Sequence, residues 1–406
     1  MGLLTSANRL HISAVKRAEI RLAASLLTQN ICKRGKNRFM SVRFRVILLV
    51  LMLMALCFGF LNLFVPHVIP YDFDRLHIFL FNLCSGGTVI LAFTRGLGRI
   101  SKTVLAFLGL SLVYAVLAFL EQYIPVVIIT LLLIAIVERV RIARFSLFPW
   151  NFFKADAPVS EKFHHAALLC LSMGLLISAI VIINNEYLHF VSMPKLQLNT
   201  FFLGFSFPVS LITMSLMFSF MIDKDRLTLF FKNLGFWNVN LGVIIFFMFI
   251  ICERLMPQVA VTLILFFTVV MIFYLFISLG QEIQQKTFLL SGMGFLLHTA
   301  VTGIVYIIYQ MIPGYYPENY HWLLRAHSFA ALYGWNLCGL AIICRYHDFP
   351  LRLHSRHIIY LHWVTVIFLA PLGTYFRPFA VLTVICYAAL LFMILFSRGN
   401  GARMRP

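Results

Sequence analysis

Charged residues are scarce in this sequence, and acidic residues are scarcer than basic ones. Charged side chains make up 12% of the 406 residues, and Asp and Glu together number only 14. A soluble domain carries about 25% charged residues. The low charge, combined with 61% hydrophobic residues and a mean hydropathy of +0.92, excludes an ordinary soluble domain.

Motifs that would identify a familiar chemistry are also missing. The eight cysteines form no CxxC pair and mostly lie within apolar runs, so we interpret them as packing residues rather than as disulfides or metal thiolates. The chain contains no P-loop, no GxSxG and no HExxH. The sequence therefore names no catalytic residue and leaves open whether the protein is an enzyme.

Apolar runs of about 20 residues recur along the chain, and each is long enough to cross the hydrocarbon core of a bilayer. We predict an all-α, multi-pass membrane protein with about twelve transmembrane helices. The predicted spans are 46–65, 76–94, 103–120, 123–138, 165–184, 200–221, 236–252, 259–279, 288–311, 322–344, 357–373 and 379–397. Three regions follow: a basic N-terminal segment (1–45), the membrane domain (46–397) and a basic tail (398–406).

The distribution of positive charge predicts the orientation of these spans. With a cytoplasmic N-terminus, 28 of the 33 Lys and Arg residues fall in cytoplasmic segments, as the positive-inside rule requires. The five outside are Arg75, Lys195, Arg254, Arg325 and Arg377. We therefore predict that both termini are cytoplasmic, and we attribute the net charge of +19 to topology and not to nucleic-acid binding. Residues 12–27 fit an amphipathic helix on the membrane surface and, equally, a disordered tail.

Two predicted spans share one design, in which a histidine near the outer end precedes small residues on the same face. His327 precedes Ala330, Ala331, Gly334 and Cys338, and His77 precedes Cys84, Ser85 and Thr88. Such a face accepts either a flat ring or another helix at close range. Both helices run from outside to inside, so the two imidazoles are at similar depth and could be axial ligands of one haem. Hydrated interfacial histidines are the alternative.

Other polar residues are assigned around this pair. Arg75, Arg325 and Arg377 lie on the same outer side, where they would bind haem propionates or serve as ordinary interface anchors. His298 is interpreted as a buried, hydrogen-bonded histidine. The remaining histidines near span ends are interpreted as surface or interface groups: His164, His165, His354, His357 and His362.

The two histidine segments also carry a family resemblance. RLHIFLFNLCSGG and RAHSFAALYGWN resemble the second and tenth helices of the haem–copper oxidase main subunit, including cbb3-type oxidases and nitric oxide reductases, and the twelve-span outline is similar to NnrS-like membrane proteins. The resemblance implies a haem b bound by His77 and His327. The tenth segment has His327-Ser328-Phe329 where the family has H-x-H, and spans 200–221 and 236–252 contain no histidine for a copper site. An oxidase-like protein without a complete haem–copper site is therefore implied, acting in electron transfer or in gas or ligand sensing.

Two other functions stay open on the sequence. A transporter or a lipid-handling protein would use the outer cluster, which consists of Asp72, Asp74, Arg75, His77, Arg325 and His327. A non-catalytic assembly partner of a respiratory complex would bind other membrane subunits. In each case we expect the lipid bilayer as a partner and the cytoplasmic (inner) membrane of a bacterium as the location.

Overall fold

The described part of the protein is built from helices. The computed structural model describes residues 39–65, 72–98, 100–192, 195–196, 204–222, 225–312 and 321–399. Within these residues no strand is present beyond two isolated bridges. Residues 12–27 and most of the predicted tail 398–406 lie outside the described residues.

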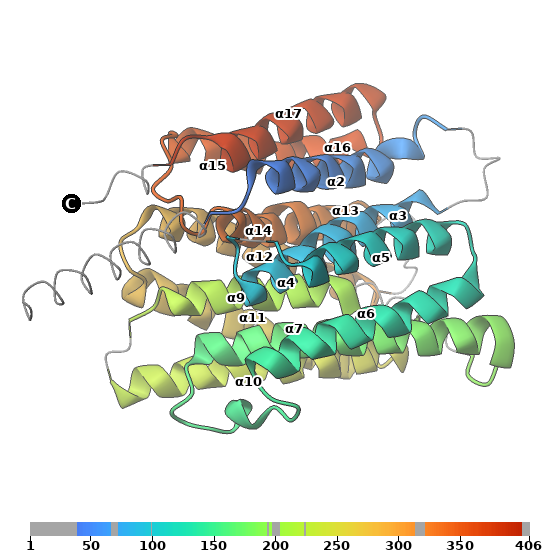
Figure 1. Cartoon of the computed structure of the whole chain (residues 1–406), viewed down its shortest axis with the longest axis horizontal. Coiled ribbons are helices and arrows are strands. Elements are labelled where there is room, and N and C mark those ends of the chain that lie inside the picture. Colours follow the sequence, from blue (N-terminus) through green and yellow to red (C-terminus); the bar gives the residue numbers. More distant parts are fainter. Residues whose placement is uncertain are drawn as a thin grey trace, which may run out of the picture.

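The helices lie side by side in one bundle (Figure 1). The first half contains α2 (Val42–Leu61), α3 (Phe73–Ile78), η1 (Phe79–Gly87), α4 (Thr88–Arg95), α5 (Lys102–Phe119), α6 (Tyr123–Arg144), η2 (Trp150–Phe152), α7 (Val159–Ile183), η3 (Asn184–Leu188) and α9 (Phe207–Ser219). The second half contains α10 (Arg226–Ile251), α11 (Leu255–Leu279), α12 (Gln284–Tyr309), α13 (His321–Phe329), η6 (Ala330–Asn336), α14 (Leu337–Cys344), α15 (Ser355–Trp363), η7 (Val364–Leu369), α16 (Ala370–Gly373) and α17 (Arg377–Phe396).

Ten helices in the described residues are long and apolar enough to cross a membrane. This confirms the predicted all-helical, multi-pass class. Each of the twelve predicted spans overlaps a helix, and the two spans beyond the ten correspond to α6 and to the shorter apolar helix Gly204–Ser219. The count of twelve crossings and the cytoplasmic location of both termini stay predictions.

Polar caps set several helix boundaries. The Ser41 hydroxyl accepts a hydrogen bond from the backbone N–H of Phe44, and the Asp225 carboxylate accepts one from Thr228. Such caps satisfy the first N–H groups of a helix, which have no partner within it. Because Ser41 caps α2, this helix begins at Val42, four residues before the predicted membrane span at 46. Arg45 therefore lies in the first turn of α2.

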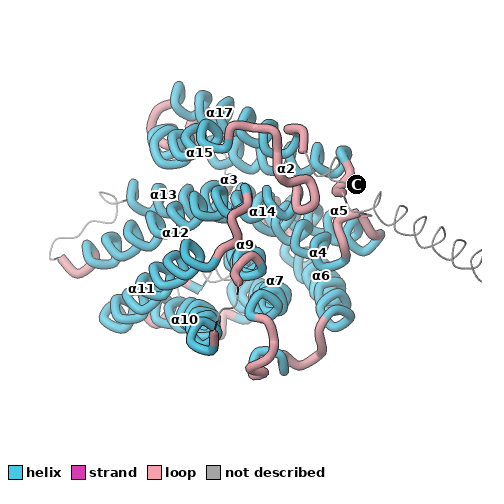
Figure 2. The backbone as a smooth tube through the Cα atoms, turned by 90° about the vertical axis from the view of Figure 1, so that its left-hand side faces the viewer, coloured by secondary structure: helices cyan, strands magenta, loops and turns pink. Residues whose placement is uncertain are grey.

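Three helical stretches form the inside of the bundle. Phe73–Arg95 and Trp322–Cys344 are 83% buried over their apolar windows, whereas the other candidate spans are 17–56% buried. Every residue of α9 except Ser210 and Ser219 is buried. The view along the bundle places α9, α4 and α14 in the middle, with the more exposed helices around them (Figure 2).

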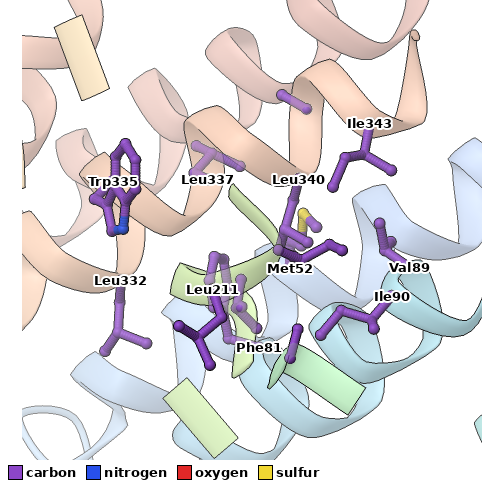
Figure 3. Packing of buried hydrophobic residues seen from close by; sticks show 14 of the residues in the cluster. Met52, Phe81, Val89, Ile90, Leu211, Leu332, Trp335, Leu337, Leu340 and Ile343 are labelled. Atoms are coloured by element: carbon purple, nitrogen blue, oxygen red, sulfur yellow. The ribbon is translucent and has the colours of Figure 1, made fainter. Parts of the chain in front are cut away.

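The three inner stretches run in the same direction. Along η1, Phe79 contacts Phe205 and the later Gly86 contacts the later Val209. Likewise Asn336 contacts Ser206, and the later Gly339 contacts the later Thr213. Figure 3 shows Phe81, Leu211 and Leu340, one from each stretch, packed in a single hydrophobic cluster. Positions near the middle of this cluster are therefore close to one another although they are separated by more than 100 residues.

Candidate functional site

The two histidine segments fold in the same way. Each carries Arg-x-His-x-Phe, at Arg75–Phe79 and at Arg325–Phe329, and each continues into a π-helix, η1 or η6. π-Helical turns are rare and often occur at functional sites. The sequence predicted the shared design but not this widened turn.

His77 packs against the preceding helix, α2. Its Nδ1 atom is 2.9 Å from the Tyr333 hydroxyl, and its ring is hydrogen-bonded to the backbone of Ala55. A Cβ atom at Gly59 would lie 2.6 Å from Nδ1, so glycine is required there for the ring to fit. His77 is thus held in a slot between α2 and η6.

His327 repeats this arrangement on α12. Its Nδ1–H donates to the Thr299 carbonyl at 2.8 Å, and its ring lies 3.2 Å from the Cβ position of Gly303. In both slots the hydrogen-bonded backbone residue precedes the glycine by four positions, which is one helical turn. The two histidines therefore occupy equivalent sites, but they turn toward different helices.

The helices that carry the histidines are neighbours, which the hypothesis of one shared haem requires. Asp74 interacts electrostatically with Arg325, and the rings of Phe81 and Tyr333 are 5.0 Å apart. The Phe329 ring packs against Tyr333 at 5.9 Å. Aromatic side chains thus fill the region next to His77.

The small residues of these helices do not pack on each other. Gly334 faces the Phe295 ring of α12, Gly339 faces Thr213 of α9, and a Cβ at Gly86 would lie 2.5 Å from Val209. Neighbouring helices pack against these small faces. Of the two uses of such a face, a flat ring or another helix at close range, the structure shows the second.

The three predicted arginines have separate environments. Arg377 donates from Nε to the Leu63 carbonyl at 2.9 Å and lies over the Phe64 ring. Arg325 lies near Asp74, whereas Arg75 pairs with Asp72 at 3.4 Å. The outer cluster is therefore not one site, because its charges divide into pairs and its histidines turn into the helix slots.

A cavity of about 150 Å³ lies beside Arg75, and we call it the outer cavity. Its polar lining residues are Arg75, Tyr114, Glu121, Tyr123, Ser178, Asn185 and Glu186. Arg75 hydrogen-bonds to Tyr123, and the hydroxyls of Tyr114 and Ser178 are 2.7 Å apart. The outer cavity therefore gathers a guanidinium, three hydroxyls, an amide and two carboxylates from α3, α5, α6, α7, η3 and the turn between α5 and α6. Of these residues, sequence reasoning singled out Arg75.

The assignment of several histidines to the surface was wrong. His362 is 3% exposed, and its Nε2–H donates to the Tyr333 carbonyl at 2.6 Å. His165 is fully buried between Arg141 and Asn151, and His164 is hydrogen-bonded to Thr94. Their position near span ends gave no sign of this burial, because other helices and a folded-back loop supply the cover. His298, expected to be buried, is partly buried next to His327.

Among the described residues, no three His, Cys, Asp or Glu side chains are grouped so that they could hold a metal ion. Comparison of the chain with protein-family models, with curated proteins and with solved structures found no match.

Proposed function

We propose that this membrane protein binds a small charged ligand in the outer cavity, as a transporter or a lipid-handling protein. The observation that carries the proposal is Arg75, whose guanidinium faces a polar cavity from an inner helix. Arginine suits the binding of phosphate and carboxylate groups, because its planar guanidinium offers several hydrogen-bond donors in a fixed geometry. A cavity with a few convergent polar groups is the usual form of a small-molecule site.

The lining favours a zwitterion. Arg75 and the hydroxyls of Tyr114 and Tyr123 are hydrogen-bond donors for an anionic group. Glu121 and Glu186 at the rim would attract an ammonium group. A cavity of about 150 Å³ holds a molecule the size of benzene. A phosphate or carboxylate joined to an amine by a short linker fits both the charge and the volume.

Replacement of Arg75 by Gln tests this proposal, and Arg377→Gln is the matched control on the same side of the membrane. Loss of a charge-assisted hydrogen bond costs about 1.5–3 kcal/mol, so Arg75→Gln should weaken binding by about tenfold or more. Soluble phosphoethanolamine would be titrated calorimetrically into the purified protein. Retention of phosphatidylethanolamine against phosphatidylglycerol would be measured by native mass spectrometry.

The two measurements separate the sources of the ligand. Binding of phosphoethanolamine alone indicates a free zwitterion, and selective retention of the phospholipid indicates a lipid headgroup. The proposal is wrong if Arg75→Gln and Arg377→Gln behave like the unaltered protein in both measurements.

We further propose twelve crossings with both termini in the cytoplasm of a bacterial inner membrane. The support is the distribution of basic residues, since only five of 33 fall in the predicted outer segments. An impermeant cysteine reagent added to intact cells should label a cysteine placed at Lys195 and not one placed at Lys154. The opposite labelling pattern would reverse the orientation.

A b-type haem bound by His77 and His327 is the second candidate. The observation that favours it is the Nδ1 hydrogen bond of His327 to a backbone carbonyl, which leaves the lone pair on Nε2, as in metal-ligating histidines. Nδ1 of His77 is likewise hydrogen-bonded. A shared haem would require both rings to turn away from α2 and α12 toward each other, with Arg75, Arg325 and Arg377 available for the propionates.

The visible spectrum decides this second candidate. With haem bound, the reduced protein should show sharp b-type bands, and either His77→Ala or His327→Ala should abolish them because alanine offers no lone pair to iron. His298→Ala is the matched control and should keep the bands. A colourless protein from cells supplied with ample haem contradicts the haem hypothesis.

A further inference from the structure

The connection between α6 and α7 exposes an unusual number of apolar side chains. In the segment 145–153, which we call the aromatic loop, Leu147 is 73% exposed, Phe148 51%, Trp150 62% and Phe153 67%. Contiguous exposed apolar groups of this kind mark an interaction surface.

A buried polar network fixes the conformation of this loop. Arg141 is 3% exposed and donates to the carbonyls of Ser146 and Leu147 at 2.9 and 3.0 Å. Arg141 also donates to His165, whose Nδ1–H in turn donates to the Asn151 side-chain oxygen at 2.7 Å. These hydrogen bonds therefore fix the backbone that carries the exposed apolar side chains.

The five consecutive carbonyls from Ser146 to Trp150 find their donors within the protein. Besides the two bonded to Arg141, the Phe148 carbonyl accepts from the Ser146 hydroxyl and from the Trp150 N–H. The Pro149 carbonyl accepts from Phe152, and the Trp150 carbonyl from Phe153, at 3.0 and 3.2 Å. Acyl chains offer no donors to a carbonyl, so irregular backbone next to them requires such internal partners. A loop in water has no such requirement.

The loop folds back along the side of the bundle. The Phe153 ring lies 5.4 Å from that of Trp237, and the Phe152 ring 5.1 Å from that of Phe236. Trp237 is eleven residues into α10, about 16 Å from its first residue at the helical rise. The apolar window of α10 is only 17% buried, so most of this helix faces outward. Figure 1 shows the connection beside α10 and α7.

We propose that the aromatic loop lies in the interfacial layer of the bilayer and binds lipid through Leu147, Phe148, Trp150 and Phe153. Trp and other aromatic residues are enriched in this layer, because their rings contact the acyl chains on one side and the headgroup region on the other. Arg144 and Lys154 flank the loop and are exposed. Their apolar stems would lie along the membrane surface while their charged ends reach the lipid headgroups. The charge distribution assigns it to the cytoplasmic leaflet.

Fluorescence quenching tests this placement on the full chain in liposomes. The emission of Trp150 is obtained as the difference between the unaltered protein and Trp150→Phe. Phospholipids brominated near the headgroup should quench this emission more strongly than iodide present on both sides of the membrane. Trp335→Phe gives the matched difference for an indole that is 1% exposed, which neither quencher should reach.

Stronger quenching of Trp150 by iodide than by brominated lipid overturns the proposal. That result would place the loop in water, as expected for a surface that docks a soluble protein. If Trp150→Phe perturbs folding, a photoreactive benzoylphenylalanine at Phe148 provides the second measurement. Its crosslinks should be to phospholipid, and their absence would equally contradict the lipid placement.

Discussion

Replacing Gly174 by Ala should lower the free energy of unfolding by about 3 kcal/mol, at the upper end of the overpacking range. A Cβ atom at Gly174 of α7 would collide with the backbone of Gly204, at the start of the helical segment Gly204–Ser219. A side chain could rotate away from such a contact, but backbone atoms move only with their whole helix. Because α9 is an inner helix, its displacement would disturb the packing of the bundle.

Gly109→Ala is the matched control for this prediction. Gly109 lies inside α5, and a Cβ there would meet nothing within 4 Å. Alanine should therefore be neutral or raise the free energy of unfolding by about 0.5–1 kcal/mol, the usual gain over glycine in a helix. Denaturant unfolding of both variants in detergent micelles gives the comparison. If both variants are equally stable, then α7 and the segment Gly204–Ser219 do not approach each other at Gly174 and Gly204.

Replacing Asp348 by Asn should lower the free energy of unfolding by about 3–5 kcal/mol, the cost of breaking a buried ion pair from one side. Asp348 pairs with Arg45 at 2.7 Å and with Arg345, and these arginines are 8% and 2% exposed. The two guanidiniums also donate to carbonyls of Ile394, Leu395 and Ser397 at the end of α17. Asparagine would leave two buried positive charges without a counterion.

Glu253→Gln is the control, because it neutralises an acid in an exposed pair. Glu253 lies 3.3 Å from Lys195, and its side chain is 61% exposed. Exposed pairs contribute about 0–1 kcal/mol, so this variant should unfold almost like the unaltered protein. Similar small losses in both variants would show that Asp348 is not the counterion of the two arginines.

Particular residues show how far sequence reasoning extended into the site. The Arg-x-His-x-Phe pattern and the small faces were visible in the sequence, and the two helices are indeed neighbours. The slots were not visible, because Gly59 and Gly303 belong to other helices and Tyr333 reaches His77 across 256 positions. The outer cavity was missed for the same reason: Glu121 and Glu186 are separated by 65 positions and meet through the packing of α5, α6 and α7.

The surface assignment of His165 shows a different kind of error. A histidine near a span end is usually hydrated, and nothing in its neighbours along the chain indicates otherwise. Its burial depends on Phe145, whose ring stacks on it at 4.6 Å, and on Asn151. Both belong to the aromatic loop, whose apolar composition is visible in the sequence but whose direction is not.

The sequence by itself determined that this protein is a helical, multi-pass membrane protein, and each predicted span overlaps a helix, although α10 begins ten residues and α7 six residues before the predicted span. Hydropathy suffices for this because a bilayer forces each apolar stretch to satisfy its own backbone hydrogen bonds, which a helix does locally. Only the tertiary structure decided which helices are inside, where the two histidine rings turn, which polar groups share the outer cavity and how the aromatic loop lies. Those features depend on contacts between helices far apart in the chain, where a single glycine or a single carbonyl of a neighbour decides the fit.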